Sequence, residues 1–330
     1  MENRKKDHIN LAFQSQILKS ELDRRFYYEP LLSRHPEGIT GNFYLAGKKL
    51  NVPVWISSMT GGTALAGKIN RNLARVAREF GMGMGLGSCR IILDDNKHFS
   101  DFDVRNELGN EFPLFANLGI AQLEQIIAKN ELGKIDALTS KLRADGLIIH
   151  VNPMQEWFQP EGGRLLRPAI ESIRILMDYA KYPVIVKEVG QGMGIGSLRA
   201  LLQLPLESIE FAAFGGTNFA MVELLRADES SQQLFEPLSR IGHDALEMVE
   251  MVNLIAKEGN VKCKNIIVSG GIKSFLDGYY LINKSILPAI YGQASCFLKY
   301  AMEDYDQLRS YAEHQVKGLE LAYSFLKIRD

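Results

Sequence analysis

The sequence is poor in cysteine and tryptophan and has no excess of charge of either sign. Its 330 residues include three cysteines and two tryptophans. Cys89, Cys263 and Cys296 form neither a CxxC motif nor the cysteine–histidine spacing of a zinc site, so we expect reduced thiols rather than disulfides or structural zinc. The 38 basic and 39 acidic residues nearly cancel. This balance argues against nucleic-acid binding but leaves room for a local cluster that binds a small anion.

Long hydrophobic runs are missing as well. No apolar stretch approaches the roughly 20 residues that a membrane-spanning helix needs. The first ten residues, MENRKKDHIN, are too polar for a secretory signal. We therefore expect a cytoplasmic protein with no membrane segment, and the 46% hydrophobic content is enough for a large core.

What the sequence does contain is an alternation of short apolar runs and longer amphipathic segments. The runs are mostly continuous in hydrophobicity, as is typical of parallel strands covered on both faces. They span residues 52–59, 81–88, 112–119, 146–152, 183–190, 208–216, 265–271 and 287–294. The intervening segments predict helices over 66–80, 121–132, 168–180 and 244–259. Eight such units predict a single-domain (β/α)8 TIM barrel; a doubly wound open sheet is the alternative, because periodicity does not distinguish the two.

Two segments lie outside this repeat. Residues 1–51 are predicted to form an N-terminal arm and a hairpin, GNFYLAGKKLNV (41–52), which could plug the bottom of the barrel formed by 52–330. A polar stretch over 224–244 follows the sixth strand and is expected to be a long loop. Long loops at the strand-exit side of a barrel often act as lids or binding elements.

Polar residues gather at the ends of the predicted strands, where the active sites of TIM barrels are built. The fourth strand carries the densest group, with His150, Asn152, Gln155 and Glu156 at its end. Polar or small residues also end the other strands, at positions 57–62, 87–90, 117, 187–188, 215–218, 269–271 and 292–295. Any one of these could be an ordinary turn, but eight together predict a site at the barrel mouth.

Glycine pairs follow the sixth and seventh strands, at 215–216 and 270–271. Glycine lets backbone N–H groups approach a phosphate at the start of a helix, and barrels commonly bind phosphate after strands seven and eight. Glycine pairs also occur in plain turns. The positions of SGGIKS (269–274) and YGQAS (291–295) favour a phosphate cradle.

Two charged residues near these ends have both a structural and a functional interpretation. Lys187 lies inside an apolar strand, where its ammonium group needs a partner. That partner is either Glu188 or Glu210, or the electron-rich ring of a cofactor such as flavin mononucleotide. Glu156 suits either a salt bridge or a hard cation that keeps several waters and binds a diphosphate.

Basic and aromatic residues outside the strands leave similar alternatives. Arg4, Lys5 and His8 belong either to a solvated tail or to a phosphate-binding arm, and Arg90 adds a fork-shaped donor for phosphate oxygens. Trp157 either packs or stabilises a developing positive charge.

Taken together, these motifs resemble the type 2, FMN-dependent isopentenyl diphosphate isomerases. The resemblance runs over nearly the whole chain and is carried by RKKDHI (4–9), SSMTGG (57–62), GSCR (87–90), HVNPMQE (150–156), VKEVG (186–190), GGTNF (215–219) and SGGI (269–272). It implies a TIM barrel with FMN, a divalent ion that is usually Mg²⁺, NADPH or another reductant, and a homotetramer or homo-octamer. It also implies interconversion of isopentenyl and dimethylallyl diphosphate in isoprenoid biosynthesis, with reduced FMN as acid and base.

The resemblance also assigns roles to residues. FMN contacts are expected from Met59, Thr60, Gly61, Ser88, Asn117, Lys187, Thr217, Gly270, Gly271, Ile272, Ala294 and Ser295. The substrate, chiefly its diphosphate, is expected to contact Arg4, Lys5, His8, Ser88, Arg90, His150, Asn152 and Gln155. Of these, Gln155, His150 and Asn152 form the catalytic group, with the question open whether Gln155 moves a proton or only positions the substrate. Glu156 is expected to bind Mg²⁺. The chain departs from the family pattern at Cys89, where many relatives have Gln, and around its sixth and eighth strands.

Two other functions fit a barrel that binds FMN. A 2-hydroxy-acid oxidase or dehydrogenase needs a catalytic histidine near the end of strand seven, whereas this strand ends in SGGI (269–272) and the nearest histidine is His243. A non-catalytic barrel that senses FMN or a phosphometabolite has no need of the polar group around Gln155 and Glu156. Both features favour the isomerase.

Overall fold

The computed structural model describes residues 2–39 and 41–329 and shows a closed barrel of eight parallel strands. The strands are β4 (Val54–Ile56), β5 (Gly83–Gly85), β6 (Leu114–Gly119), β7 (Gly146–His150), β8 (Val184–Lys187), β9 (Ser208–Glu210), β10 (Asn265–Ser269) and β11 (Ala289–Gln293). They neighbour one another in chain order, and β11 pairs with β4 to close the ring. The TIM-barrel prediction is therefore confirmed, and the open sheet is excluded.

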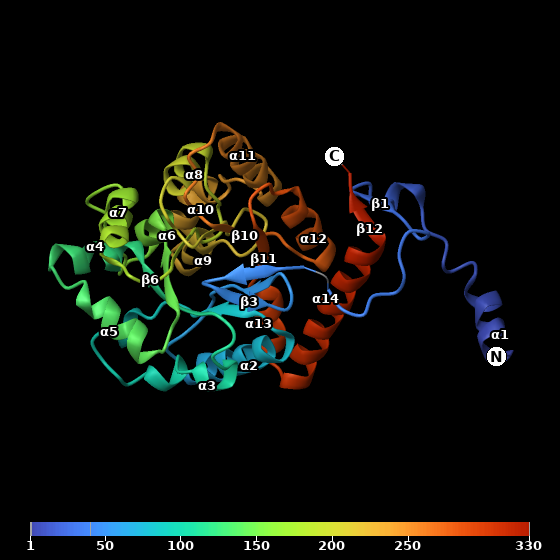
Figure 1. Ribbon diagram of the computed structural model, residues 1–330. Coiled ribbons are helices and arrows are strands. Elements are labelled where there is room, and N and C mark those ends of the chain that lie inside the picture. The colour runs from blue at the N-terminus through green and yellow to red at the C-terminus, as the bar shows by residue number, and fades with distance from the viewer. Residues whose placement is uncertain (1, 40, 330) are drawn as a thin grey trace.

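Helices cover the outside of the barrel (Figure 1). They include α2 (Ala64–Phe80), α4 (Ile120–Ala128), α5 (Gly133–Lys141), α7 (Ala169–Tyr179), α8 (Ile195–Leu202), α11 (Ala245–Glu258), α12 (Phe275–Lys284), α13 (Ser295–Ala301) and α14 (Tyr305–Phe325), with the short α3 (Arg105–Leu108) and α6 (Pro153–Phe158) between them. α2 shows how the sequence sets such a helix: the Thr63 hydroxyl accepts the Ala66 N–H at its start, and Leu73, Val76 and Ala77 form its buried face. Within the described ranges, no helix has the length and hydropathy of a membrane span.

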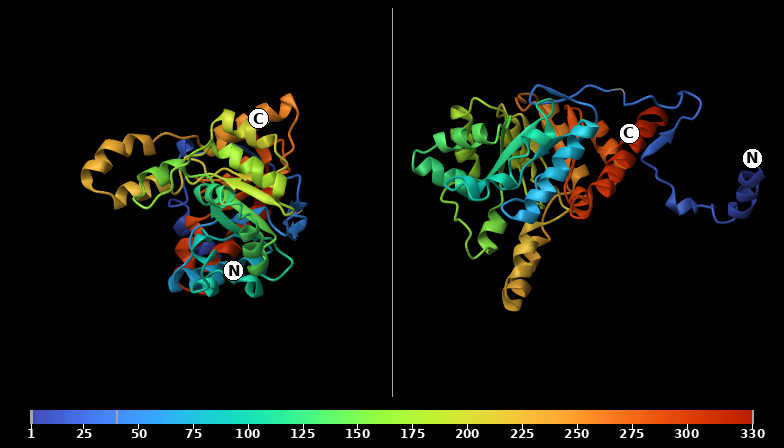
Figure 2. Two further views of the ribbon diagram at one scale, coloured as in Figure 1. Left: turned by 90° about the vertical axis from the view of Figure 1, so that its left-hand side faces the viewer. Right: turned by 90° about the horizontal axis from the view of Figure 1, so that it is seen from below.

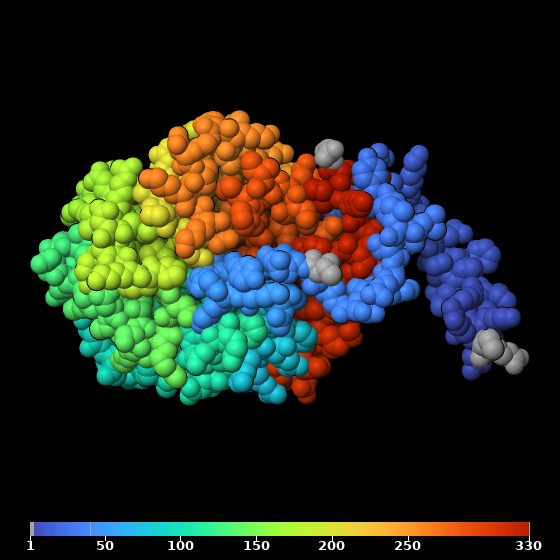
Figure 3. Space-filling model, viewed as in Figure 1, coloured from blue at the N-terminus to red at the C-terminus, as the bar shows by residue number. Residues whose placement is uncertain are grey.

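A hairpin closes the bottom of the barrel, as predicted. Its strands β2 (Phe43–Leu45) and β3 (Lys48–Leu50) pair antiparallel, and it occupies the centre of the face seen in Figure 3. Leu45 and Leu50 are completely buried against the barrel interior, which is filled at this level by Trp55, Phe115, Ile148, Ile185, Ile267 and Ile290. The carboxylate of Glu207 accepts the Ala46 N–H at 2.6 Å and so holds the hairpin turn.

The N-terminal arm is attached to the body of the molecule around residues 25–28, whereas its first helix lies apart from it. Strand β1 (Phe26–Tyr28) pairs antiparallel with β12 (Leu326–Ile328) near the other end of the chain. Beyond this pairing, helix α1 (Glu2–Leu11) stands away from the barrel body in Figures 1 and 2.

The polar segment after β9 is helical, in contrast to the long loop expected from the sequence. α9 (Phe219–Arg226) is followed by α10 (Glu229–Ser239), whose first turn is capped by the Asp228 carboxylate. Phe235 of α10 packs on Phe158 of α6, with ring centroids 5.5 Å apart. The right-hand view of Figure 2 shows this segment projecting from the barrel on the side opposite the hairpin.

Candidate active site

The carboxyl ends of the barrel strands surround two neighbouring cavities. The larger measures about 530 Å³ and the smaller about 420 Å³, each with its open mouth included. Five residues line both of them: Ser58, Met59, Lys187, Val189 and Phe219. The two cavities therefore adjoin, and we call them together the depression at the mouth of the barrel, where TIM-barrel enzymes carry out their chemistry.

Glycine loops after β9 and β10 form one wall of the larger cavity. Gly270 and Gly271 have φ angles of 90° and 71°, in the left-handed region that favours glycine. A Cβ on Gly270 would lie 2.1 Å from the carbonyl oxygen of Ala213, and one on Gly216 would lie 3.1 Å from the Gly271 nitrogen. Side chains are thus excluded where the two loops meet, and backbone forms the cavity wall. Such a wall fits a phosphate group.

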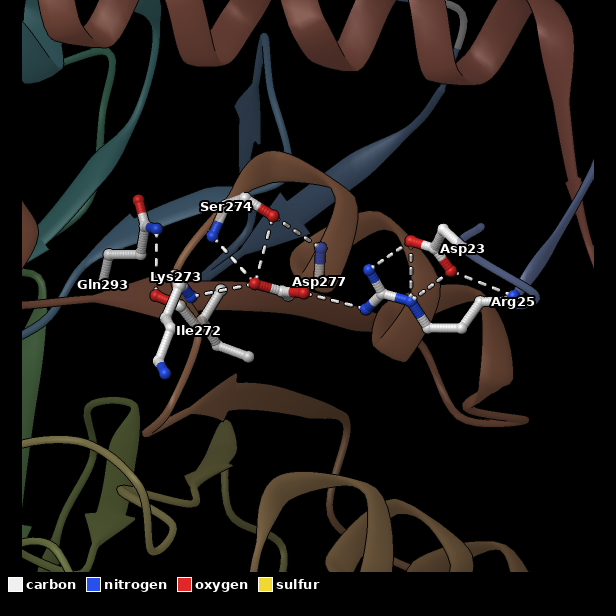
Figure 4. A network of polar contacts seen from close by, with 7 residues as sticks. All are labelled: Asp23, Arg25, Ile272, Lys273, Ser274, Asp277 and Gln293. Carbon is white, nitrogen blue, oxygen red and sulfur yellow. Dashed lines mark hydrogen bonds and ion pairs between the residues drawn. The ribbon is translucent and has the colours of Figure 1, made fainter. Parts of the chain in front are cut away.

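The loop after β10 is fixed by side chains from three separate parts of the chain (Figure 4). Asp277 accepts the Lys273 N–H through Oδ2, at 3.0 Å, and a guanidinium N–H of Arg25 through Oδ1, at 2.8 Å. The amide of Gln293 donates to the Ile272 carbonyl at 3.2 Å. The glycine loop is therefore held in place by the N-terminal arm, α12 and β11 together.

Lys187 ends β8 and lines both cavities. Its Nζ donates to the backbone carbonyl of Glu188 at 2.8 Å. The Glu188 carboxylate accepts three backbone N–H groups of residues 190–192, at 2.6 to 3.0 Å, while burial raises its pKa. In the described part of the chain, neither Glu188 nor Glu210 forms an ion pair with Lys187. The salt-bridge interpretation of Lys187 is therefore wrong at this geometry, and the ammonium group remains beside the cavity.

His150 stands on the wall of the smaller cavity as a neutral imidazole. Its Nδ1 lies 2.8 Å from Oδ1 of Asn117, and the Asn117 Nδ2 donates to the Leu86 carbonyl at 3.0 Å. The second bond orients the amide, so Nδ1 of His150 must be the protonated nitrogen and Nε2 the acceptor. Burial, and to a smaller extent the charge of Lys187, lowers the pKa of His150 to about 3.

A buried polar cluster lies next to this wall. The Asn152 amide donates to Oε1 of Gln155 at 2.9 Å, and the Gln155 amide donates to Oε1 of Glu223 at 3.4 Å. Both ends of the Gln155 side chain are therefore engaged, which fixes its orientation at the cavity. Glu223 was not predicted from the sequence, where its only signal is an acidic residue in the helix FAMVELLR, whose one other charged residue is Arg226.

Glu156 is buried in the same cluster. Its Oε2 accepts the Gly163 N–H at 2.5 Å, and its Oε1 accepts from Asn152 at 3.3 Å. Oδ1 of Asn152 is buried without a hydrogen-bond partner among the residues that the structure describes. The same residues contain no group of three or more histidine, cysteine or acidic side chains that could hold a metal ion. A divalent ion here would thus take one or two protein oxygens and the rest of its ligands from water and substrate phosphates.

Most residues predicted for the site meet at the depression. The predicted residues that line it are Met59, Ser88, Asn117, His150, Gln155, Lys187, Thr217, Gly270, Gly271, Ile272, Ala294 and Ser295. Asn152 does not line it but donates to Gln155, which does, and Glu156 is linked to Gln155 only through Asn152. Phe219 and Glu210 also line the larger cavity, although neither was predicted as a site residue, and Gln293 lines it from the predicted strand end 292–295.

Other predicted residues lie outside the cavity walls. Thr60 and Gly61 are in the loop after β4, and Arg90 is exposed on the short turn after β5. Arg4, Lys5 and His8 are exposed on α1, the helix that stands away from the barrel body in Figure 1.

Two residues with open interpretations also lie away from the walls. Trp157 is 59% exposed, with the guanidinium of Arg164 4.2 Å from its ring centroid, so it does not face the cavity. Cys89 is fully buried, and burial raises the pKa of its thiol to about 12.

Solved structures share this fold. A mandelate oxidase variant with an FMN adduct aligns with a TM-score of 0.56 and 15% identity, over 92% of this chain and 88% of that one. A flavocytochrome b2 variant with benzoylformate aligns with a TM-score of 0.61 and 12% identity, over 92% and 76% of the two chains. At these identities the likeness shows the fold alone.

Sequence relatives are more specific. No protein-family model matches the chain. The isopentenyl-diphosphate delta-isomerase of Rickettsia rickettsii (strain Sheila Smith) is 36% identical over 303 residues, which cover 90% of this chain and 85% of that protein. The protein of the same name from Rickettsia canadensis (strain McKiel) is 36% identical over 301 residues, with the same coverage. By this similarity over nearly its whole length, the chain belongs to the isopentenyl-diphosphate delta-isomerase family.

Proposed function

We propose that this protein interconverts isopentenyl and dimethylallyl diphosphate and uses FMN as its cofactor, as a type 2 isomerase. The observation that carries the proposal is the pair of adjoining cavities at the barrel mouth. The larger has a glycine-lined wall suited to phosphate, the smaller carries the neutral hydrogen-bonding side chains of Asn117, His150 and Gln155, and Lys187 lines both. Family membership supports the reaction, and the FMN-binding proteins of the same fold support the cofactor.

The residues of the larger cavity fit FMN. The loop of Gly270 and Gly271, with the start of α13 at Ser295, would hold the phosphate. Lys187 would place a positive charge beside the flavin ring, and Asn117 would meet the ring edge. When bound and reduced, for example by NADPH, FMN would supply an electron-rich ring and a nitrogen that carries a proton.

The smaller cavity would bind the alkene and the phosphate group nearest to it. The reaction adds a proton at one carbon and removes one at another, so there is no net redox change. Neutral His150 would accept a hydrogen bond through Nε2 without placing a cation beside a carbon that gains positive charge. Gln155, engaged by Asn152 and Glu223, suits a positioning role better than proton transfer.

The diphosphate would be neutralised by a metal ion and by cations from outside the depression. Glu156 would hold Mg²⁺ with the diphosphate and water as further ligands. Arg90 and the α1 residues Arg4, Lys5 and His8 would contact the phosphate oxygens once the arm closes over the mouth. We further propose a cytoplasmic homotetramer or homo-octamer, in line with the family resemblance.

A 2-hydroxy-acid oxidase is the second candidate, because its members share the fold. Across the described residues, neither cavity is lined by a histidine from the loop after β10. His243 bonds Glu247 at 2.9 Å and lies outside both walls. A barrel that only senses FMN would in turn have no use for the cluster of Asn152, Gln155 and Glu223.

Flavin content and label uptake test the proposal. The purified protein should be yellow and should bleach with dithionite or NADPH. The reduced protein with Mg²⁺ should then incorporate deuterium from heavy water into isopentenyl diphosphate and form dimethylallyl diphosphate, and omission of the reductant is the control. A protein that takes up no flavin on reconstitution would overturn the proposal. Flavin reduction by lactate, glycolate or mandelate, without label uptake, would favour the oxidase.

A further inference from the structure

Glu210 is a buried carboxylate at the mouth end of β9, and the function proposed above assigns it no role. Its side chain is 0% exposed. Oε1 accepts the hydroxyl of Ser269 at 3.3 Å, whereas Oε2 has no hydrogen-bond partner anywhere in residues 2–39 and 41–329. A carboxylate buried with an unpartnered oxygen is costly, so a donor is needed to offset it.

The side chain of Glu210 faces the larger cavity. In the barrel, Glu210 lies in register with Lys187 of β8 and Ile267 of β10, and Ile267 belongs to the apolar layer inside the barrel. Residues in register on neighbouring strands share a face of the sheet, so Glu210 points inward as well. Glu210, Lys187 and Ser269 all line the larger cavity.

The nearest cation does not supply the missing donor. Lys187 donates to the carbonyl of Glu188, and the described part of the chain shows no ion pair between Lys187 and Glu210. A ligand bound in the cavity that Glu210 lines can supply this donor.

The position of Glu210 indicates which part of the bound ligand supplies the donor. β9 lies between β8, which carries Lys187, and β10, which leads to Gly270 and Gly271. A flavin ring beside Lys187 and a phosphate on the glycine loop would leave the connecting chain next to Glu210. In FMN this chain is a ribityl group, whose hydroxyls are hydrogen-bond donors. We infer that Glu210 accepts a hydrogen bond from a ribityl hydroxyl of FMN and thereby positions the cofactor.

This inference rests on the proposed function and predicts effects of opposite sign for Glu210→Gln. In the apoprotein, the substitution keeps the size of the side chain and removes a poorly partnered buried charge, so the thermal unfolding midpoint should stay the same or rise. In the complex, a charge-assisted hydrogen bond is replaced by a weaker one to the neutral amide, so the Kd for FMN should rise roughly 10-fold.

Glu207 provides a matched control three residues earlier in the chain. Its buried carboxylate is fully engaged at the opposite end of the barrel, by the Ala46 N–H at 2.6 Å and the Lys264 ammonium at 2.9 Å. Glu207→Gln should therefore lower the unfolding midpoint of the apoprotein and leave the Kd for FMN within about twofold of wild type.

The experiment compares the three apoproteins by thermal unfolding and by fluorescence titration with FMN. Titration with 2′-, 3′- and 4′-deoxy-FMN then completes a double-mutant cycle. In this cycle each ribityl hydroxyl is removed from the ligand, and the carboxylate of Glu210 is removed from the protein, singly and together. In wild type one of these analogues should bind at least about tenfold more weakly than FMN. In Glu210→Gln, whose amide oxygen is an uncharged and weaker acceptor, the same analogue should lose less affinity relative to FMN than it does in wild type.

Three results would overturn the inference. The first is an FMN affinity of Glu210→Gln within twofold of wild type. The second is a fall in the unfolding midpoint of its apoprotein like that of Glu207→Gln. The third is a variant in which every deoxy analogue loses as much affinity relative to FMN as it does in wild type. A wild-type apoprotein that binds no FMN would instead overturn the proposed function, before any variant is compared.

Discussion

The neutral state of His150 makes the protein sensitive to acid in a way that a single substitution should remove. Burial and the charge of Lys187 lower the pKa of His150 from 6.5 to about 3. In the unfolded chain the same imidazole titrates near its ordinary pKa of 6.5. Between these values the unfolded state binds more protons than the folded state. The stabilising contribution is thus complete above pH 6.5 and decreases as the pH falls toward 3.

The magnitude follows from the two pKa values. Each pH unit between them costs about 1.4 kcal/mol, so two units, from 6.5 to 4.5, cost about 3 kcal/mol of unfolding free energy. The variant His150→Gln cannot titrate and can still donate to Oδ1 of Asn117. Its free energy of unfolding should therefore fall between pH 7.5 and 4.5 by about 3 kcal/mol less than that of wild type.

Urea unfolding followed by circular dichroism, at pH 7.5 and pH 4.5, measures this difference. Other titrating groups act on both proteins alike and cancel in the comparison. A second variant, Lys187→Met, removes the smaller cause of the pKa shift, so its acid-induced loss should lie between those of wild type and His150→Gln. Equal losses in wild type and His150→Gln would show that His150 is not kept neutral by the fold.

Three further substitutions test the site and the barrel. Glu156→Gln should weaken activity and its dependence on Mg²⁺ while FMN stays bound, as measured by initial rates against Mg²⁺ and by flavin absorbance; loss of flavin would place Glu156 in the cofactor site or scaffold. Gly270→Ala should raise the Kd for FMN at least tenfold, because its φ is 90° and the new Cβ would meet the Ala213 carbonyl, and unchanged flavin titrations would contradict a cradle at this loop. Leu45→Ala should destabilise the protein by about 3 kcal/mol in chemical unfolding without changing the FMN affinity of the folded protein, because it opens a cavity in the fully buried hairpin plug.

The barrel could be predicted because its strands carry a local signal. The run GLII (146–149) is apolar at consecutive positions, as is typical of a parallel strand buried on both faces. The hairpin also carries a local signal, because a turn separates two short strands whose leucines, Leu45 and Leu50, point into the barrel. The pairing of β1 with β12 had no such signal, because the two strands are about 300 residues apart and each has only three residues.

The site was predictable as a set of strand ends but not as a set of contacts. The sequence places Gln155 and Asn152 near each other, since both follow one strand. It does not show that Glu223, on the helix after another strand, accepts a hydrogen bond from Gln155. Nor does the sequence decide between the two interpretations of Lys187: Lys187 and Glu210 are neighbours on adjacent strands, yet the lysine bonds a backbone carbonyl.

The arm explains how residues that lie apart from the mouth in the structure can still belong to its chemistry. Arg25 is fixed to Asp277 at the start of α12, beside the glycine loop, so the arm is anchored at the edge of the mouth. Seventeen residue steps separate His8 from Arg25, and an extended chain of this length spans up to roughly 60 Å. The cations of α1 can therefore reach the depression while β1 stays paired with β12. A diphosphate that gathered them there would leave the barrel and the anchor unchanged, and only residues before Arg25 would have to move.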